Sequence, residues 1–542
     1  MFQKICTLRD VDDRFLNPQY TDLSDPFTMN DMPQAVEQII TAIKNNTMVA
    51  IYADYDADGI PGSVVLADFF RLISFTNYVV YIPHRHKEGY GLHISAIDKL
   101  AEQGVGLFIT IDLGITAVRE IAYAQSLGLK IIVTDHHEPD SVLPDSLLVH
   151  PKLGNYADPM LCGCAVVFQL VRAIAVRLRE TDPIYVIALP IGFEKWLLDM
   201  VGLSTLADMV PLQNENRILS YYGMKVLRKS RRIGLQALAN VSRISLSTID
   251  ETGIGFRIVP YINAASRMAH PELAYQLLSA TDLSTAAQLA SVLSGHNTAR
   301  KSAVDKIMKT AVQIAIAQNE SPILWVGDPD WNVGVLSIIA GRLCEQFNKP
   351  VFVWTHHENE YIKGSARCGQ GFSVTDFFQS APIGIFERSG GHTFAGGFTM
   401  NRDSVPAFFT HSEQYMSTVD KNQNTDDLSA PPENYDIILS LQDCNEIFMA
   451  ELDLLRPFGV GNVAPVFKFV NIRPVERKMF GKTSSHEKII VTDDSGVMRS
   501  ILLFSGDRTK CEHWEIGKAY NICAQIEISG EGRWREIVLK LT

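Results

Sequence analysis

The chain of 542 residues is predicted to be an α/β protein, with a parallel-sheet domain first, a smaller α/β domain second and a small β-barrel last. Three observations predict this order. Apolar runs alternate with helix-period stretches from about residue 30 to residue 235, a helix-rich stretch follows, and short β-rich runs separated by turns fill residues 466–541. Because 46% of so long a chain is hydrophobic, two to four domains with separate cores are expected.

The first domain is predicted from buried strands that are followed by helices. Strands are expected at 48–53, 107–111 and 130–133, and helices at 64–73, 94–102, 117–127 and 166–178. Repeated strand-then-helix order implies right-handed crossovers, and therefore a parallel sheet that helices cover on both faces.

The later elements are predicted from composition and turn signals. Residues 271–319 are rich in helix formers and contain no proline after Pro271, so long connecting helices are expected. The second α/β unit is expected to contain a strand at 322–326, a helix at 335–347, a strand at 351–354 and the glycine-dense segment 390–397. A polar linker at 417–433, a helical segment at 443–455 and five β-rich runs (466–470, 488–491, 498–504, 519–528 and 535–541) complete the chain.

Acidic and histidine side chains gather mainly where the predicted strands end. They are Asp54, Asp56, Asp58, Asp112, Asp135, His136, His137 and, farther along the chain, Asp208. Open α/β sheets bind ligands at this edge, and crowded carboxylates mixed with histidine suit Mg²⁺ and Mn²⁺. A lone Asp after a strand is usually a helix N-cap and a lone buried His is usually a core residue, so it is the ordered set that indicates a two-metal hydrolytic site.

These segments resemble motifs I to IV of the DHH phosphoesterase superfamily. Other segments make the chain similar to the RecJ family of single-strand-specific DNA exonucleases. They are 82–85, 88–92, 161–163, 207–212 with Asn216 and Arg217, 263–268, 331–335, 364–367, 390–392, 395–397 and 457–462. The resemblance runs from about residue 48 to beyond residue 460 and covers most of the chain.

The resemblance implies a domain order and boundaries. It predicts a DHH phosphoesterase domain at 1–240, a connecting helical segment at 241–320, a DHHA1 domain at 321–415, a linker at 416–435 and an OB-fold nucleic-acid-binding domain at 436–542. An OB-fold holds single strands by base stacking and backbone charge.

The cofactors implied are two divalent metal ions, Mn²⁺ or Mg²⁺. The expected metal ligands are Asp56, Asp58, Asp112, His136 and Asp208, and Asp112 is expected to bridge the ions because it follows the central strand. Asp54, Asp135 and His137 complete the catalytic set. One of these three either orients a ligand histidine or acts as general acid for the leaving 3′-oxygen, and the sequence does not separate the two roles.

A substrate-binding pocket for the 5′-phosphate is also implied by the resemblance. Its expected residues are Arg85, Arg267, Ser365, Arg367, Gly390, Gly391 and His392, and Tyr90 is expected to stack on a base. Taken alone, each arginine is more often a surface ion-pair partner and Tyr90 a core aromatic residue.

The function implied is 5′→3′ hydrolysis of single-stranded DNA to 5′-mononucleotides, in recombination and repair. Single-stranded DNA, a helicase or a single-strand-binding protein, and no membrane are the expected partners, and a monomer is expected. Two alternatives are an oligoribonuclease or cyclic-dinucleotide phosphodiesterase of the DHH type, and a non-catalytic replication scaffold. The OB-like tail argues against the phosphodiesterase, and the complete set of carboxylates argues against the scaffold.

The chain departs from the family pattern at four positions, Leu113, Tyr261, Ser266 and Asn332. None of these departures removes an expected metal ligand. Asn332 stands where the family usually has a histidine, so it is the departure most able to alter phosphate contacts.

Composition limits the compartment and the class of protein. No run of about 18 apolar residues and no apolar leader are found, so a cytoplasmic protein is expected. Eight scattered cysteines do not provide a four-ligand zinc set and are expected to be reduced thiols. The net charge of -12 does not exclude nucleic acid, because metal ions neutralise part of it.

Overall fold

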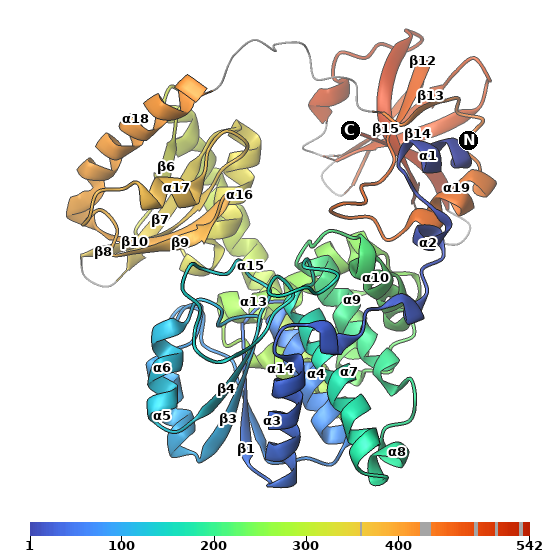
Figure 1. Ribbon diagram of the computed structural model, residues 1–542. Helices are drawn as coiled ribbons and strands as arrows, with labels where there is room; N and C mark the ends of the chain where they lie inside the picture. The colour runs from blue at the N-terminus through green and yellow to red at the C-terminus, as the bar shows by residue number, and fades with distance from the viewer. Residues whose placement is uncertain (358–359, 423–434, 482–485, 505–507, 530–534) are drawn as a thin grey trace.

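The computed structural model describes residues 1–542 except 358–359, 423–434, 482–485, 505–507 and 530–534. Figure 1 shows three bodies: a parallel-sheet domain, a smaller α/β domain joined to it through a long helix, and a C-terminal barrel. The predicted fold class is confirmed.

The first domain contains a parallel five-stranded sheet in the order β2-β1-β3-β4-β5. The strands are β1 (Met48–Ala53), β2 (Tyr78–Tyr81), β3 (Val105–Ile111), β4 (Lys130–Thr134) and β5 (Leu147–Val149). The three predicted strands are β1, β3 and β4, and the two short edge strands were not predicted. Strand β3 is central, so the residue that follows it, Asp112, lies in the middle of the carboxyl edge.

Helices cover both faces of this sheet, as predicted. On one face lie α3 (Met32–Lys44), α4 (Gly59–Leu72) and α7 (Gly163–Thr181), and on the other lie α5 (Ile94–Glu102) and α6 (Val118–Ser126). Helices α8 (Ile184–Ala188), α9 (Leu198–Ala207), α10 (Asn214–Leu227) and α11 (Ile233–Ser242) pack against other helices of the domain. Alternate strand residues enter two separate cores. Ile51 and Ile109 pack with α3, α4 and α7, whereas Tyr52 and Phe108 pack with α5 and α6.

Short helices lead to the 35-residue helix α15, which joins the first two domains. The short helices are α12 (Glu251–Gly253), α13 (Val259–Met268) and α14 (Glu272–Leu278), and α15 spans Leu283–Ala317. Helix α15 contacts α11 and α13 along its first half and α16 of the second domain along its second half. The expected connecting helices are therefore present, and α15 contributes to the cores of both domains.

The second domain has a mixed sheet in the order β6-β7-β8-β10-β9. Its elements are β6 (Leu324–Gly327), α16 (Leu336–Phe347), β7 (Val351–His357), β8 (Tyr361–Arg367), α17 (Val374–Gln379), β9 (Arg388–His392), β10 (Ala395–Asn401) and α18 (Val405–Asn422). Only β6 and β7 pair in parallel. Buried phenylalanines, among them Phe352, Phe377 and Phe408, fill the core on one face.

The C-terminal domain is a closed barrel. Its elements are β11 (Ile437–Leu439), α19 (Glu446–Leu452), β12 (Phe467–Phe480), β13 (His486–Thr492), β14 (Met498–Leu503), β15 (Tyr520–Ser529) and β16 (Glu536–Leu541). Strands follow the order β12-β13-β14-β16-β15, and β15 pairs back onto β12. Closure leaves no open sheet edge among these five strands, as expected of an OB-fold.

Two segments lie differently from the expected domain boundaries. Helices α1 (Phe2–Leu8) and α2 (Asp13–Leu16) lie beside the barrel (Figure 1), Ile5 is buried in its core and Arg9 pairs with Asp436 at 2.5 Å. A short amphipathic helix does not encode which core it joins, so residues 1–16 were placed with the first domain. Helix α18 continues to Asn422, because its polar residues do not stop a helix, and the rest of the expected linker, 423–434, lies outside the described residues.

In the part of the chain that the structure describes, no helix is both long and apolar enough to cross a membrane.

Candidate metal centre and phosphate pocket

The structure brings the predicted acidic and histidine residues together at the carboxyl edge of the first sheet. Asp54, Asp56 and Asp58 follow β1, Asp112 follows β3, the residues 135–137 follow β4, and Asp208 ends α9. Three groups of possible metal ligands form there, each with ligand atoms within 4.8 Å of one another. They are Asp112 with His136 and His137, Asp58 with His136 and Asp208, and Asp54 with Asp56 and Asp112.

Asp112 belongs to two of these groups and is held by an unusual backbone. Its φ of 63° lies in the left-handed region, which is uncommon for a residue other than glycine and is typical of functional sites. A side chain on Gly163 would place its Cβ 2.6 Å from the Asp112 Cβ, so only glycine permits the approach of α7. The Asp112 side chain is therefore fixed at the centre of the cluster.

Asp58 is anchored at the beginning of α7. Its two carboxylate oxygens accept hydrogen bonds from the Gly163 N–H at 2.6 Å and the Cys164 N–H at 2.8 Å. Asp56 in turn accepts from the backbone N–H groups of Asp58 and Gly59 at 2.8 and 3.1 Å. These bonds orient both carboxylates, and the helix N-terminus favours their charge.

His136 faces three carboxylates. Its Nε2 lies 3.1 Å from Asp112 Oδ1, 3.7 Å from Asp58 Oδ2 and 3.6 Å from Asp208 Oδ2. Burial lowers the His136 pKa to about 3, and the charge of His137 adds to this, so the ring is neutral at neutral pH. Asp112 Oδ1 is buried without a hydrogen-bond partner beside the neutral His136 ring, and this arrangement suits two ligands of one metal ion.

Burial and mutual repulsion raise the pKa of four carboxyls in the cluster. Burial is the larger cause for each, and the charges of neighbouring aspartates add to it. The pKa of Asp58 rises to about 6 and that of Asp208 to about 8, and those of Asp54 and Asp112 also rise. A divalent cation bound here would oppose these shifts, because it favours the ionised form of each carboxyl.

Asp135 behaves differently, because hydrogen bonds surround it. It accepts from the backbone N–H groups of Ile115, His136 and His137 and from the His137 ring at 2.7 Å. Burial opposes ionisation, but these bonds outweigh it and hold the pKa of Asp135 well below its usual range. Burial alone would lower the pKa of His137. The hydrogen bond to Asp135 and the charge of Asp135 outweigh burial and raise the His137 pKa to about 9. Asp135 therefore holds the His137 ring through a hydrogen bond to Nδ1.

Positively charged residues gather beside this cluster. Arg267, at the end of α13, donates to Gly334 O at 3.0 Å and Ser337 Oγ at 2.8 Å. Burial and then the charges of nearby arginines lower its pKa to about 9, and burial and the Arg85 charge lower the pKa of Arg367. The arginines acting on Arg267 are Arg85, Arg300 and Arg367. Among the described residues, none of Arg85, Arg267 and Arg367 forms an ion pair with a carboxylate.

The two clusters meet at the junction of the first two domains. The rings of His137 and His392 stack with centroids 5.9 Å apart and planes at 8°. Arg85 lies over the Tyr55 ring at 4.8 Å, and its charge partly opposes the rise in the Asp54 pKa that burial causes. The structure therefore places the expected phosphate pocket next to the expected metal ligands.

The remaining pocket residues line the same junction. Ser365 Oγ lies 3.3 Å from Arg367 Nη1, and strand β9 with Gly390, Gly391 and His392 is exposed. A side chain on Gly391 would place its Cβ 2.2 Å from Ala395 O. Tyr90 is 49% exposed and packs edge-on against His137 with centroids 5.9 Å apart, so it is not a core aromatic residue.

Sequence reasoning did not single out Tyr55 or Arg300. Tyr55 supports Arg85, and its position between two ligand candidates was the available signal. Arg300 lies on α15, where its charge reaches Arg267, and a helix of mixed polarity gives no local signal for that. Of the departures, Asn332 accepts from the Gly334 N–H at 2.8 Å and so caps the turn before α16, while Leu113 and Ser266 are buried.

Comparison with known proteins agrees with this arrangement. Three domain families match: the DHH family N-terminal domain over residues 48–192, the DHHA1 domain over 308–418 and the RecJ OB domain over 435–537. The chain is 32% identical to the single-stranded-DNA-specific exonuclease RecJ of Bacillus subtilis. The match covers 91% of the chain and 61% of the length of that relative. It is also 32% identical to the RecJ of Haemophilus influenzae, over 71% of the chain and 68% of the relative.

Solved structures show the same fold. The crystal structure of Thermus thermophilus RecJ with Mn²⁺ superposes on the whole chain with a TM-score of 0.82 at 24% identity, and 75% of that protein is covered. A manganese-bound exonuclease RecJ superposes on 73% of the chain and 97% of its own length, with a TM-score of 0.63 at 29% identity. On these grounds the chain belongs to the RecJ family.

Proposed function

We propose that the chain is a metal-dependent 5′→3′ exonuclease that hydrolyses single-stranded DNA to 5′-mononucleotides. The observation that carries the proposal is that two clusters of opposite charge lie side by side. Among the described residues, the aspartates of one form no ion pair with a lysine or arginine, and Arg85, Arg267 and Arg367 of the other form none with a carboxylate. A phosphodiester beside a terminal phosphate, together with divalent ions, supplies both clusters with partners of opposite charge. RecJ relatives named as single-stranded-DNA-specific exonucleases support the substrate class.

The residues present fit two divalent ions. Asp56, Asp58, Asp112, His136 and Asp208 would hold them, with Asp112 shared, and the groups also place Asp54 and His137 within reach. The unpartnered Oδ1 atoms of Asp54 and Asp112 and the neutral His136 are the donor set that Mn²⁺ or Mg²⁺ accepts. Bound there, the ions would screen the phosphate charge and make a water deprotonate near neutral pH.

The protein's own groups would orient the reaction. Asp135 fixes the His137 ring through Nδ1, which leaves Nε2 free to face the scissile phosphate or the leaving 3′-oxygen. In the absence of ions the ring keeps a proton at neutral pH, because its pKa is about 9. We propose that His137 is the proton donor to the leaving oxygen, and that Asp135 holds it in that orientation.

The arginine pocket would select the end of the strand. Guanidinium groups bind phosphate oxygens in pairs, and Arg85, Arg267 and Arg367 converge without a carboxylate to neutralise them. Tyr90 would stack on the terminal base, and the C-terminal barrel would hold the strand farther along. Hydrolysis one nucleotide from a bound 5′-phosphate releases a 5′-mononucleotide.

The cellular setting is also a proposal. None of the eight cysteines forms a disulfide in the described structure, which fits the reducing cytoplasm. We propose a monomer acting in recombination and repair on strands exposed by a helicase or covered by a single-strand-binding protein.

The function can be tested with one panel of 3′-labelled substrates. The chain is incubated with Mn²⁺ or Mg²⁺ and single-stranded DNA, single-stranded RNA or duplex DNA, and a cyclic dinucleotide is assayed beside them. Progressive loss from the 5′-end of DNA alone supports the proposal. Preferential cleavage of RNA or the cyclic dinucleotide, or no cleavage of any substrate, contradicts it.

A further inference from the structure

A loop of the C-terminal domain, residues 456–462, lies against the segment that carries Asp208. We call it the docking loop. The Leu212 N–H donates to Val460 O at 2.8 Å, and Gln213 Nε2 donates to Gly461 O at 3.2 Å. These bonds join residues almost 250 positions apart in the sequence.

Arg217 fixes the beginning of this loop. It is 2% exposed, and its guanidinium donates to the carbonyls of Leu454, Leu455 and Arg456 at 2.7–3.1 Å. Asn462 closes the loop from inside, because its Nδ2 donates to Leu455 O and Pro457 O, both at 2.8 Å. The loop is therefore bound to α10 of the first domain at its beginning and closed on itself through Asn462.

Two glycines allow the close approach. A Cβ on Gly459 would lie 2.8 Å from Leu212 Cδ1, and a Cβ on Gly461 would lie 3.2 Å from Pro211 Cβ. Gly461 also has a φ of 73°, which disfavours any other residue. Side chains at these positions would force Pro211 and Leu212 to shift, so the two glycines favour the close fit of the two domains.

The segment 208–212 is fixed at two ends. At one end the Asp208 N–H donates to Ser204 O at 2.8 Å and ends α9, and at the other Leu212 bonds to the docking loop. Between them Met209 has a φ of 58° and is 68% exposed. A left-handed residue in an exposed position needs support from both ends to hold one conformation.

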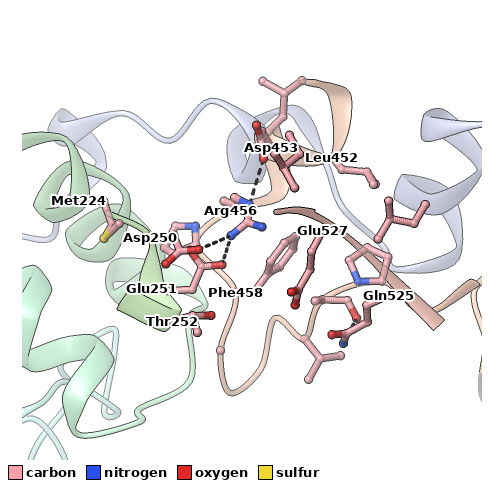
Figure 2. Close-up of a pocket in the computed structure, with 18 of the residues that line it drawn as sticks. Met224, Asp250, Glu251, Thr252, Leu452, Asp453, Arg456, Phe458, Gln525 and Glu527 are labelled. Carbon is pink, nitrogen blue, oxygen red and sulfur yellow. Dashed lines mark hydrogen bonds and ion pairs between the residues drawn. The ribbon is translucent and has the colours of Figure 1, made fainter. Parts of the chain in front are cut away.

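Open space lies on one side of the segment. Met209 lines a cavity of about 840 Å³ between the first domain and the barrel, and Pro457, Phe458 and Val460 line the same cavity. Figure 2 shows Arg456 at its edge, bound to Glu251 at 2.6 Å and Asp453 at 3.0 Å. The docking loop therefore supports residues 210–212 through Leu212, in addition to the packing of Val210 in the core of the first domain.

We propose that the docking loop positions Asp208, so that the C-terminal domain completes the metal site as well as holding DNA. This inference rests on the proposed function only in taking Asp208 as a metal ligand. It predicts that damage to the loop weakens metal binding without weakening the grip on DNA.

A matched pair of glycine variants tests the proposal. Gly461→Ala and Gly496→Ala change glycines of nearly equal φ, 73° and 75°, in the same domain, but nothing lies within 4 Å of a Cβ at Gly496. Both variants carry the same backbone strain and should lose similar thermal stability. Only Gly461→Ala changes the contact with Pro211.

Three readouts are needed on the full chain. Mn²⁺ affinity is measured by calorimetry without DNA, hydrogen exchange of residues 208–212 is measured in EDTA, and kcat and KM are measured on single-stranded DNA. We expect Gly461→Ala to bind Mn²⁺ about tenfold more weakly, as is typical when support of a metal ligand is lost. It should also exchange faster at Leu212 and lose kcat at unchanged KM, while Gly496→Ala matches the wild type.

Equal Mn²⁺ affinity and equal exchange in the two variants would overturn the proposal. If Gly461→Ala does not fold, Gln213→Ala removes one bond to the loop and should weaken Mn²⁺ binding about threefold, in line with one hydrogen bond; unchanged affinity would equally overturn it. A wild-type chain that binds Mn²⁺ but leaves DNA intact contradicts the proposed function alone, since affinity and exchange still decide the role of the loop.

Discussion

The acidic cluster and the arginine cluster carry opposite charges, and their pKa values shift in opposite directions. In the first, burial and then the charges of neighbouring aspartates raise the carboxyl pKa values, whereas in the second, burial and then the charges of neighbouring arginines lower the guanidinium pKa values. Among the described residues, the aspartates form no ion pair with a lysine or arginine, and Arg85, Arg267 and Arg367 form none with a carboxylate. The comparison indicates that the acidic cluster suits cations and the arginine cluster suits an anion. A phosphate chain would therefore lie where the two clusters meet.

The largest effect should come from breaking the acidic side. Asp112→Ala removes the carboxylate shared by two ligand groups, so hydrolysis of single-stranded DNA should fall at least about a hundredfold. Single-turnover assays with saturating Mn²⁺ measure this. Asp98→Ala, at a surface carboxylate bound to Tyr123, is the control and should keep wild-type activity. Hydrolysis by Asp112→Ala at the wild-type rate would show that the cluster is not the reacting centre.

Asp135→Asn sharpens the distinction between ligand and orienting group. The amide keeps the shape of the side chain but cannot hold His137 as a charged partner, so kcat should fall about tenfold while Mn²⁺ binding changes less than in Asp112→Ala. The pH dependence of kcat should shift to lower pH as well, because Asp135 is what raises the His137 pKa. An unchanged pH profile would remove His137 from the role of proton donor.

Breaking the basic side should change selectivity more than rate. Arg367→Ala should reduce kcat/KM about tenfold on 5′-phosphorylated strands and much less on 5′-hydroxyl strands, the loss expected for one charge-assisted contact. Arg388→Ala, on exposed strand β9, is the matched control. Equal losses on both strands would contradict the assignment of the pocket.

The smallest effect is a pH dependence of stability without metal. The pKa of Asp208 is about 8 in the folded chain and 3.8 in the unfolded chain, so folded Asp208 keeps a proton that the unfolded chain has lost. The pKa of His137 is about 9 in the folded chain and 6.5 in the unfolded chain, so folded His137 also keeps its proton above pH 6.5. Both contributions to stability are lost as pH rises, so the Tm in EDTA should fall by about 3 °C between pH 6.5 and 8. Differential scanning fluorimetry measures it, and Asp208→Asn should flatten the fall. A Tm that rises between pH 6.5 and 8 would contradict the raised pKa values of Asp208 and His137.

Much of the fold and of the acidic side could be predicted, because their signals are local. Strands β1, β3 and β4 appear as apolar runs, and the residue after each run marks the carboxyl edge. The short strands β2 and β5 could not be predicted, since three or four residues carry too little periodicity.

Non-local packing was beyond the sequence. The docking loop bonds to residues almost 250 positions away, and Arg300 reaches Arg267 only because α15 passes the first domain. The difference between Asp135 and Asp112 could also be recognised only from the structure. One carboxylate is saturated by hydrogen bonds and the other has a buried oxygen with none, although both follow a strand.

The most direct test of the account is the location of Mn²⁺ by anomalous scattering in crystals of the full chain. The account predicts two ions about 4 Å apart, held by Asp56, Asp58, Asp112, His136 and Asp208 with Asp112 between them. Crystals soaked in Mn²⁺ with no anomalous peak among these side chains would contradict it.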